Sequence, residues 1–234
     1  MSSSIIKIKP VISKADRKIF IKLIWDIYKD DPSWVPPIIM ERMAAIDPNK
    51  NPYFEHAKVK LWIAYKDGNP VGRISAQIDE LVSINHGINT GHYGYFDCIN
   101  NKEVANALFD TACCWLRENG MIEVIGPFSL SINEETGLLV EGFDTPPMLL
   151  MGHSRPYFEN LVLGTGLKKI KDTWAYRLDI KKPILSPVLE KLINRAVDKG
   201  KVSFRPINMS KYEEELKILI GRNETFPLST ARLI

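Results

Sequence analysis

The stretch from residue 59 to 79 contains a turn that fixes how this chain begins to fold. Two runs rich in β-branched and aromatic residues, VKLWIAY and PVGRISAQID, flank the tetrapeptide Lys66-Asp67-Gly68-Asn69. An Asp-Gly pair between two such runs is typical of a tight hairpin, because its central residues adopt positive φ. The sequence therefore predicts two antiparallel strands, and the other predicted strands are expected to join the same sheet.

The periodicity of apolar residues predicts the other elements. Strands are expected at 5–12, 90–99, 121–130 and 171–180. Helices are expected from Ser13 to a point before Pro32, near 38–45, from Asn100 or Asn101 to Gly120, and near 156–163. This order predicts a mixed α/β layout, with a central sheet and helices packed on it.

Cap residues and strand alternation add detail. Ser13 followed by Asp16 resembles a capping box, and Ser186 with Pro187 marks the start of another helix, which Gly200 ends. In the strand 90–99, alternation places Tyr93, Tyr95 and Asp97 on one face.

Composition excludes several classes of function. Apolar residues make up 45% and charged residues 25% of the 234 positions, as in an ordinary globular protein, and the net charge is only +3. The cations are dispersed, so no nucleic-acid partner is expected. The chain has no run of 18 apolar residues and its first residues do not form a signal peptide, so no membrane partner is expected. Three cysteines without a pairing pattern favour a cytoplasmic location.

The end of the chain echoes its beginning. The segment Val202-Ser203-Phe204-Arg205-Pro206-Ile207 repeats the pattern of Ile6-Lys7-Ile8-Lys9-Pro10-Val11, and Ser210-Lys211 then repeats Ser13-Lys14. Either the echo is chance, or residues 201–234 begin a second copy that this chain does not complete. The second alternative predicts a truncated tandem protein whose exposed apolar helix face favours self-association into a homo-oligomer.

In their order along the chain, the elements resemble the GNAT superfamily of acyl-CoA-dependent N-acyltransferases. Three stretches carry the resemblance: KVKLWIAYKDGNPVGRISAQID, YGYFDCINNKEVANALFDTACCWLRENGMIEVIGP and PYFENLVLGTGLKKIKDTWAYRLD. The stretches DPSWVPP, NPYFEHA, GPFSLSINEETG and GFDTPPM also look like one bacterial branch of that superfamily. The resemblance implies a mostly antiparallel sheet with helices on both faces. We expect a GNAT-like domain at 1–180, a linker helix at 181–200 and the incomplete second unit at 201–234.

The resemblance also implies an activity. Acetyl-CoA or another acyl-CoA would lie where two parallel strands splay apart, and a small-molecule or peptide amine would attack the thioester. A general base would take the proton from the amine, a backbone N–H would stabilise the oxyanion, and an acid would protonate the leaving thiolate.

The family's cofactor loop, Q/R-x-x-G-x-G/A, matches Asn100–Ala105 in this sequence. The resemblance assigns cofactor contacts to Cys98, Ile99, Asn101, Lys102, Val104 and Ala105. Glu103 replaces a glycine, and its charge beside a diphosphate would cost on the order of a few kcal/mol, which Lys102 could offset in part. Alternatively, Glu103 only interacts favourably with the helix dipole. The tyrosine that acts as general acid in many family members corresponds to Val162 in this sequence. Tyr157 lies more than one helical turn earlier and does not match that position.

Four residues are candidates for catalysis. Glu134 and Glu135 lie in a long loop after a central strand. They either have a functional role, in which they hold a cationic amine or act as its base, or they are solvated surface residues. Asp97 ends a central strand and either acts as a base or faces water. His153 lies near the loop and the last helix, and it is the best placed of the histidines. No metal site is expected, because the histidines lack ligand spacing.

The leading hypothesis is a cytoplasmic N-acyltransferase that moves an acyl group, expected to be acetyl, to an amine in a ternary complex. One rival is a binding module with this fold that has lost its cofactor site. The other is a truncated remnant without its partner domain.

Overall fold

The predicted hairpin organises the sheet. In the computed structural model, which describes residues 5–82, 89–179, 181, 185–200 and 205–225, Asp67 and Gly68 have φ of 51° and 86° and join two long strands. The five strands lie in chain order: β1 (Ile6–Pro10), β2 (Ala57–Lys66), β3 (Asn69–Asp79), β4 (Thr90–Cys98) and β5 (Glu123–Ile125). The first four are antiparallel, and β5 runs parallel to β4.

The described helices before residue 165 are α1 (Lys14–Lys22), α2 (Ile24–Ile27), α3 (Ile39–Ala45), the 3-10 turn η1 (Pro52–Glu55), α5 (Lys102–Glu118) and α6 (Phe158–Gly164). Two of them, α1 and α5, begin at the predicted caps Ser13 and Asn101. The backbone N–H of Ser13 donates to Asp16 at 2.8 Å, and the Asp16 N–H donates to the Ser13 hydroxyl at 3.1 Å, so the capping box is confirmed. Asn101 caps α5 by accepting from the N–H of Val104. The helix predicted from Ser13 to Pro32 is interrupted at Leu23 and forms α1 and α2.

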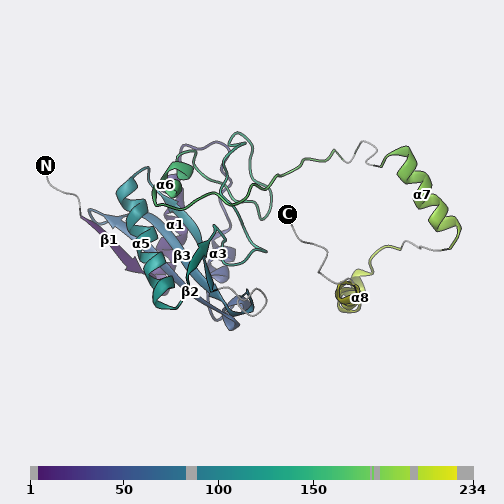
Figure 1. The fold of residues 1–234 in the computed structure, drawn as a ribbon, viewed down its shortest axis with the longest axis horizontal. Coiled ribbons are helices and arrows are strands. Elements are labelled where there is room, and N and C mark those ends of the chain that lie inside the picture. The colour runs from purple at the N-terminus through teal and green to yellow at the C-terminus, as the bar shows by residue number, and fades with distance from the viewer. Residues whose placement is uncertain (1–4, 83–88, 180, 182–184, 201–204, 226–234) are drawn as a thin grey trace. The chain divides into compact units, whose positions relative to one another are not determined.

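Helices cover both faces of the sheet (Figure 1). On one face, Phe109 of α5 packs against Tyr93 and Phe96. On the other, Phe20 of α1 packs against Tyr95. The prediction that Tyr93 and Tyr95 share a face is therefore wrong. The register between β3 and β4 shifts in this region, and Tyr95 has φ of 46°, so a β-bulge reverses the alternation along β4.

The chain that follows β5 crosses over β4. The predicted strand 121–130 is reduced to three residues, because Pro127 cannot donate to a ladder and the next residues turn away. Gln77, fully buried in β3, donates from its amide to the carbonyls of Phe128 and Leu130 at 2.8 and 3.1 Å. The crossing passes directly over Gly94, where a Cβ would overlap the Phe128 carbonyl. This crossing carries the loop 129–154 onto the sheet.

The chain divides into two units, Met1–Thr173 and Trp174–Ile234. The strand predicted at 171–180 is absent over residues 171–179, where Trp174, Tyr176 and Leu178 are exposed. No described strand pairs with this segment, and a strand without a ladder partner leaves its backbone groups unpaired. Ile180 lies outside the described residues.

The second unit contains α7 (Pro187–Asp198), the 3-10 turn η2 (Met209–Lys211) and α8 (Tyr212–Thr225). The predicted cap of α7 is confirmed, since the Ser186 hydroxyl accepts from the N–H of Leu189. Of the predicted echo, residues 201–204 lie outside the described residues, and 205–208 form no strand.

The crossing at Gly94 predicts a specific sensitivity. Gly94→Ala should lower the free energy of unfolding by about 1–3 kcal/mol, because the new methyl group meets backbone that is pinned to Gln77. Gly164→Ala is the control: it lies in α6 with open space around it and should be neutral or slightly stabilising. Urea unfolding of both variants measures the difference, and equal stabilities would refute the tight crossing.

Candidate functional site

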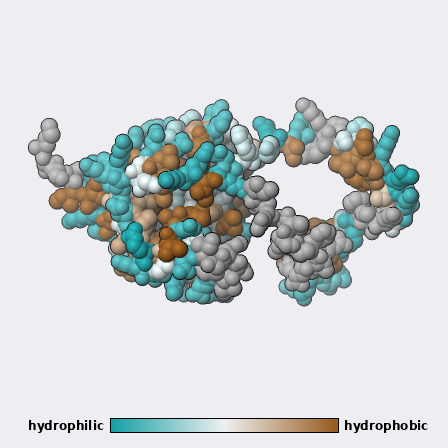
Figure 2. Space-filling view, in the orientation of Figure 1, coloured by the Kyte–Doolittle hydropathy of each residue, from teal (hydrophilic) through white to brown (hydrophobic). Residues whose placement is uncertain are grey.

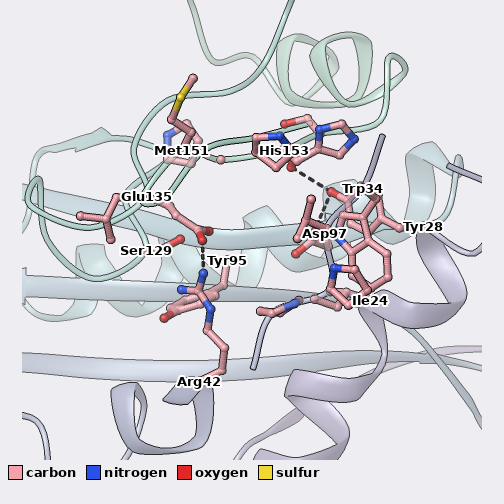
Figure 3. Close-up of a pocket in the computed structure, with 18 of the residues that line it drawn as sticks. Ile24, Tyr28, Trp34, Arg42, Tyr95, Asp97, Ser129, Glu135, Met151 and His153 are labelled. Carbon is pink, nitrogen blue, oxygen red and sulfur yellow. Dashed lines mark hydrogen bonds and ion pairs between the residues drawn. The ribbon is translucent and has the colours of Figure 1, made fainter. Parts of the chain in front are cut away.

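We call residues 127–154, which follow β5, the crossing loop. A cavity of about 360 Å³ lies between this loop and the helices α1 and α2. Its floor comes from β3 and β4, and its walls come from α1, α2, residues 34–38, α3 and the loop segments 127–138 and 147–154. Figure 3 shows Arg42 and Glu135 on one side and Tyr28, Trp34, Asp97 and His153 on the other. We call this cavity the polar pocket, because charged side chains from four separate segments, and His153 from a fifth, converge in it.

Asp97 is held from two directions. Its Oδ2 accepts from Arg73 at 2.8 Å, and its Oδ1 accepts from the Tyr28 hydroxyl at 2.7 Å. The guanidinium of Arg73 also lies over the rings of Phe20 and Tyr95 and donates to the Phe20 carbonyl. Burial, together with the charge of Asp97, raises the pKa of Tyr28 well above its ordinary value. Tyr28 therefore stays a hydroxyl donor, and Asp97 is a fully bonded structural carboxylate.

His153 forms a second polar group with Asp31. Its Nε2 lies 2.9 Å from the Asp31 carboxylate, its side chain is only 5% exposed, and its Nδ1 is buried with no hydrogen-bond partner among the described residues. Burial opposes ionisation of Asp31, but the hydrogen bonds from His153 and Ser33 and the charges of His153 and Arg155 outweigh it, so the pKa of Asp31 lies below its ordinary value. In the neutral form that carries its proton on Nε2, His153 donates that N–H to Asp31, and Nδ1 is then an acceptor without a partner among the described residues.

The opposite side of the polar pocket is formed by an ion pair between Arg42 of α3 and Glu135 of the crossing loop (Figure 3). Glu134 is next to this pair, and burial raises its pKa, in opposition to the charge of Arg42. The two glutamates therefore differ. The ion pair with Arg42 neutralises Glu135, whereas Glu134 is partly shielded from water and feels the Arg42 charge without a side-chain hydrogen bond among the described residues.

The structure brings three of the four candidate catalytic residues into one cavity, since Asp97, Glu135 and His153 all line the polar pocket. Glu134 is adjacent in the chain to Glu135 but does not line the cavity. Sequence reasoning missed the residues that hold them: Tyr28, Asp31, Arg42 and Arg73. Arg73 carried a signal, because a charged residue inside the otherwise apolar strand PVGRISAQID has to find a partner.

The six residues that resemblance assigns to the cofactor lie at the end of β4 and the start of α5. Cys98, Val104 and Ala105 are fully buried, whereas Ile99 and Asn101 are half-buried and Lys102 is exposed. The accessible part of the expected site is therefore the segment from Ile99 to Glu103, at the N-terminus of a helix of 17 residues, where backbone N–H groups favour an anion. Glu103 is exposed in the first turn and Lys102 is beside it. None of the six lines the polar pocket.

Tyr157 is close to this segment. Its hydroxyl donates to the carbonyl of Cys98 at 2.9 Å, although the sequence placed it outside the family's tyrosine position. Burial raises the pKa of Tyr157 to about 12, so the hydroxyl keeps its proton.

A second cavity, of about 490 Å³, lies beside β5 and α6. It shares Pro127, Gly137 and Leu138 with the polar pocket, so one stretch of the crossing loop forms the wall between the two cavities. Its lining is mostly apolar, with Tyr93, Ile125, Val140, Val162, Leu163 and Leu167. Lys168, Lys169 and Lys171 also contribute to it.

In the part of the chain that the structure describes, no cluster of three His, Cys, Asp or Glu side chains could hold a metal ion. None of the helices described there is both long enough and apolar enough to cross a bilayer.

The fold is GNAT-like, as the resemblance implied. Four antiparallel strands are followed by a fifth that runs parallel to β4 over only three residue pairs and then leaves it, beside a helix that starts at the end of β4. The expected mixed, mostly antiparallel sheet with helices on both faces is confirmed.

No protein-family model matches the chain. Two longer proteins are similar to it. The bacterial ceramide synthase of Caulobacter vibrioides (strain NA1000 / CB15N) is 43% identical over 211 residues, which is 90% of this chain and 54% of that protein. Protein YghO of Escherichia coli (strain K12) is 40% identical over 215 residues, 91% of this chain and 54% of that protein. The chain thus spans about half the length of these relatives.

Three solved structures resemble the chain at low sequence identity. A tandem GNAT protein from the clavulanic acid biosynthesis pathway is 12% identical, with a TM-score of 0.46. The match covers 69% of this chain and 43% of that protein's chain. An aminoglycoside acetyltransferase from an uncultured soil metagenomic sample, in complex with sisomicin, is 13% identical, covers 74% and 97%, and also has a TM-score of 0.46. Aminoglycoside N-acetyltransferase AAC(6')-Iy in complex with CoA is 13% identical, covers 75% and 96%, and has a TM-score of 0.44.

The buried pair beneath the polar pocket predicts a large effect on stability. Arg73→Met should lower the free energy of unfolding by about 3–5 kcal/mol, because it leaves the Asp97 carboxylate buried without its cation. Lys169→Met removes an exposed ion pair with Asp172 and should change stability by less than about 1 kcal/mol. Chemical denaturation compares the two, and similar small losses would show that Asp97 does not depend on Arg73.

Proposed function

We propose that this chain is an N-acyltransferase that moves an acyl group from acyl-CoA to an amine held in the polar pocket. The observation that carries the proposal is the convergence of Asp97, Glu135 and His153 on one cavity, next to the point where β4 and β5 part. Acyl transfer to an amine needs a proton acceptor, a place for a cationic substrate and a route for the thioester. The residues around the cavity offer all three.

His153 is the proposed general base. The oxygens of Asp97 are already bonded to Tyr28 and Arg73, and Glu135 is paired with Arg42. His153 instead has an unpaired Nδ1, while its Nε2 is oriented by Asp31. An imidazole held by a carboxylate on one nitrogen can accept a proton on the other. Asp31 is the positioning residue in this arrangement.

The acidic residues Glu134 and Glu135 are proposed to attract the protonated amine into the polar pocket. An approaching ammonium would compete with Arg42 for Glu135 and would also lower the cost of ionising the partly buried Glu134. Once bound, the amine releases its excess proton to solvent water and becomes a nucleophile. Lys102 and the free N–H groups at the start of α5 are proposed to hold the phosphates of the donor.

The bond changes follow from this placement. The neutral amine nitrogen attacks the thioester carbonyl, a C–N bond forms, the C–S bond breaks, and Nδ1 of His153 takes the proton that the nitrogen loses. The thiolate leaves and takes the proton that His153 accepted, so CoA is released as a thiol and His153 returns to its neutral form. The register between β3 and β4 shifts at Tyr95 and Phe96, and a backbone N–H of this bulge is the proposed oxyanion donor. The second cavity is the proposed path of the donor, because it adjoins the polar pocket through a shared wall.

The acceptor is proposed to be an amphiphilic amine. The relative from Caulobacter vibrioides carries the name ceramide synthase, and a ceramide is the amide of a long-chain amine. The polar pocket agrees with such a molecule, since charged groups form its floor while Trp34, Ile38 and Leu149 lie along its walls. A head with an amine would reach His153, and an apolar tail would extend outward.

One observation favours the rival, non-catalytic binding module. Val104 and Ala105 are fully buried, and Glu103 stands where the family has a glycine, so the site expected for the cofactor is smaller than the resemblance implies. A binding module would bind amines in the polar pocket without turning over a thioester.

Incubation of the chain with an acyl-CoA and a panel of primary amines distinguishes the two. We expect release of free thiol together with a new amide of the corresponding mass, with long-chain amines preferred over short ones. Amine binding seen by calorimetry, with no thiol release from acetyl or longer acyl-CoA thioesters, would contradict the proposal and support the binding module.

The role of His153 has its own test. His153→Gln places an amide nitrogen near the position of Nε2, so it can keep the contact with Asp31 while it removes the base. It should lower kcat by about 10²–10⁴-fold with a much smaller change in KM.

The control is a second histidine–aspartate pair outside the polar pocket. His56 Nδ1 lies 3.0 Å from Asp79, and His56→Asn should leave kcat within about twofold of the wild-type value. Steady-state thiol release measures both variants. An unchanged kcat in His153→Gln would remove His153 as the base.

A further inference from the structure

Two segments that contain proline surround the mouth of the polar pocket with exposed apolar side chains. One is Val35-Pro36-Pro37-Ile38, and the other is Pro147-Met148-Leu149-Leu150-Met151; every residue of both lines the pocket. We call their six large exposed side chains the apolar rim: Val35, Ile38, Met148, Leu149, Leu150 and Met151. Leu149 is 87% exposed and Met148 is 75% exposed.

Exposure alone does not identify a docking surface, because hydrophobic residues reach the surface at several places on the face shown in Figure 2. The apolar rim differs in its grouping and its composition. Its six members belong to one cavity, although they come from segments more than 100 residues apart. Neither the stretch 33–40 nor the stretch 145–152 contains a charged residue.

The two segments are tied together at their bases. Asp31, just before the first segment, bonds to His153, just after the second, at 2.9 Å and lies 3.4 Å from Arg155. The Tyr28 hydroxyl, which donates to Asp97, also lies 3.1 Å from the carbonyl oxygen of His153. Prolines restrict the backbone of both segments, and Leu150 is held at φ of 60°, an uncommon conformation for a residue with a Cβ. The backbone that carries the apolar rim is therefore held in place by hydrogen bonds at its base and by its prolines.

Resting on the function proposed above, we propose that the apolar rim docks on a lipid bilayer and takes the amine acceptor from it. The protrusion of the side chains fits a surface better than a single alkyl chain, since most of Met148 and Leu149 lies outside any groove. A second copy of the chain on this face would close the mouth of the polar pocket. A bilayer instead places the apolar rim among acyl chains and the charged floor at the depth of the headgroups.

This partner differs from the sequence expectation of no membrane. That expectation rested on the lack of a spanning segment, and docking through loops needs none. A protein held at the interface by a few apolar side chains binds reversibly, with an affinity that depends on how much apolar area enters the lipid.

Sedimentation with neutral phosphatidylcholine vesicles tests the proposal, without donor or acceptor present. The full chain should bind, and binding should change little between 0.1 and 0.5 M salt, because the contact is apolar. The double variant Met148→Asp/Leu149→Asp should reduce the partition coefficient at least tenfold. Ile122→Asp is the matched control, since Ile122 is 79% exposed and lies outside the rim, and it should bind like the wild type.

Circular dichroism and thermal unfolding check that the variants keep their fold, and Val35→Asp/Ile38→Asp provides an independent pair on the other segment. The proposal is overturned if the wild type does not bind vesicles, or if rim and control variants bind equally. It is also overturned if light scattering shows a wild-type dimer that the rim variants convert to a monomer. Since no turnover is measured, a failure here leaves the proposed acyl transfer standing, and a failure of acyl transfer leaves the docking result intact.

Discussion

The amide of Gln77 holds the structure around the polar pocket together. It is fully buried in β3 and bonds the carbonyls of Phe128 and Leu130, which fixes the chain that follows β5 across Gly94 of β4. Without this crossing, the loop 129–154 would have no fixed position on the sheet, and neither Glu135 nor His153 would face the residues of α2 and α3. Unpaired carbonyls buried at this point would cost free energy, so the Gln77 amide stabilises the crossing together with the backbone hydrogen bond from the Phe128 N–H to the Tyr93 carbonyl at 2.8 Å.

Within the polar pocket, the charged groups have different tasks because they have different partners. Arg73 and Tyr28 satisfy Asp97, which therefore stabilises the floor. Asp31 orients His153 and leaves one ring nitrogen unpaired. The same contact joins the two segments that carry the apolar rim. The proposed chemistry and the proposed docking thus share one hydrogen bond, which places the base a short distance beneath the surface that would meet the lipid.

Much of the fold was predictable because local signals agreed with the global structure. The Asp67-Gly68 turn, the Ser13 and Ser186 caps and the apolar stripe of α5 each depend on neighbours in sequence. The face of Tyr95 was not predictable, because a β-bulge reverses strand alternation without any residue that announces it. The prediction of a strand at 171–180 was wrong over residues 171–179 for another reason. Alternation of apolar residues indicates that a segment can pair, but it does not supply the partner strand.

The candidate site was predictable in part. The sequence predicts Asp97, Glu135 and His153 as candidates for catalysis, and the fold brings them to one cavity. Their partners Tyr28, Asp31, Arg42 and Arg73 were not selected, because tertiary pairing across the chain has no sequence spacing to reveal it. The residues proposed to contact the cofactor come from the resemblance instead, and three of the six, Cys98, Val104 and Ala105, are fully buried.

Thermal unfolding in the presence of CoA and its acyl thioesters tests the central claim most directly. A ligand that binds only the folded chain stabilises it by about 2.7 kcal/mol at 100 times its Kd, so the account predicts that Tm rises steadily with CoA concentration and rises further with a long acyl chain. An unchanged Tm at millimolar CoA and millimolar acyl-CoA would contradict the claim that this fold still works on thioesters.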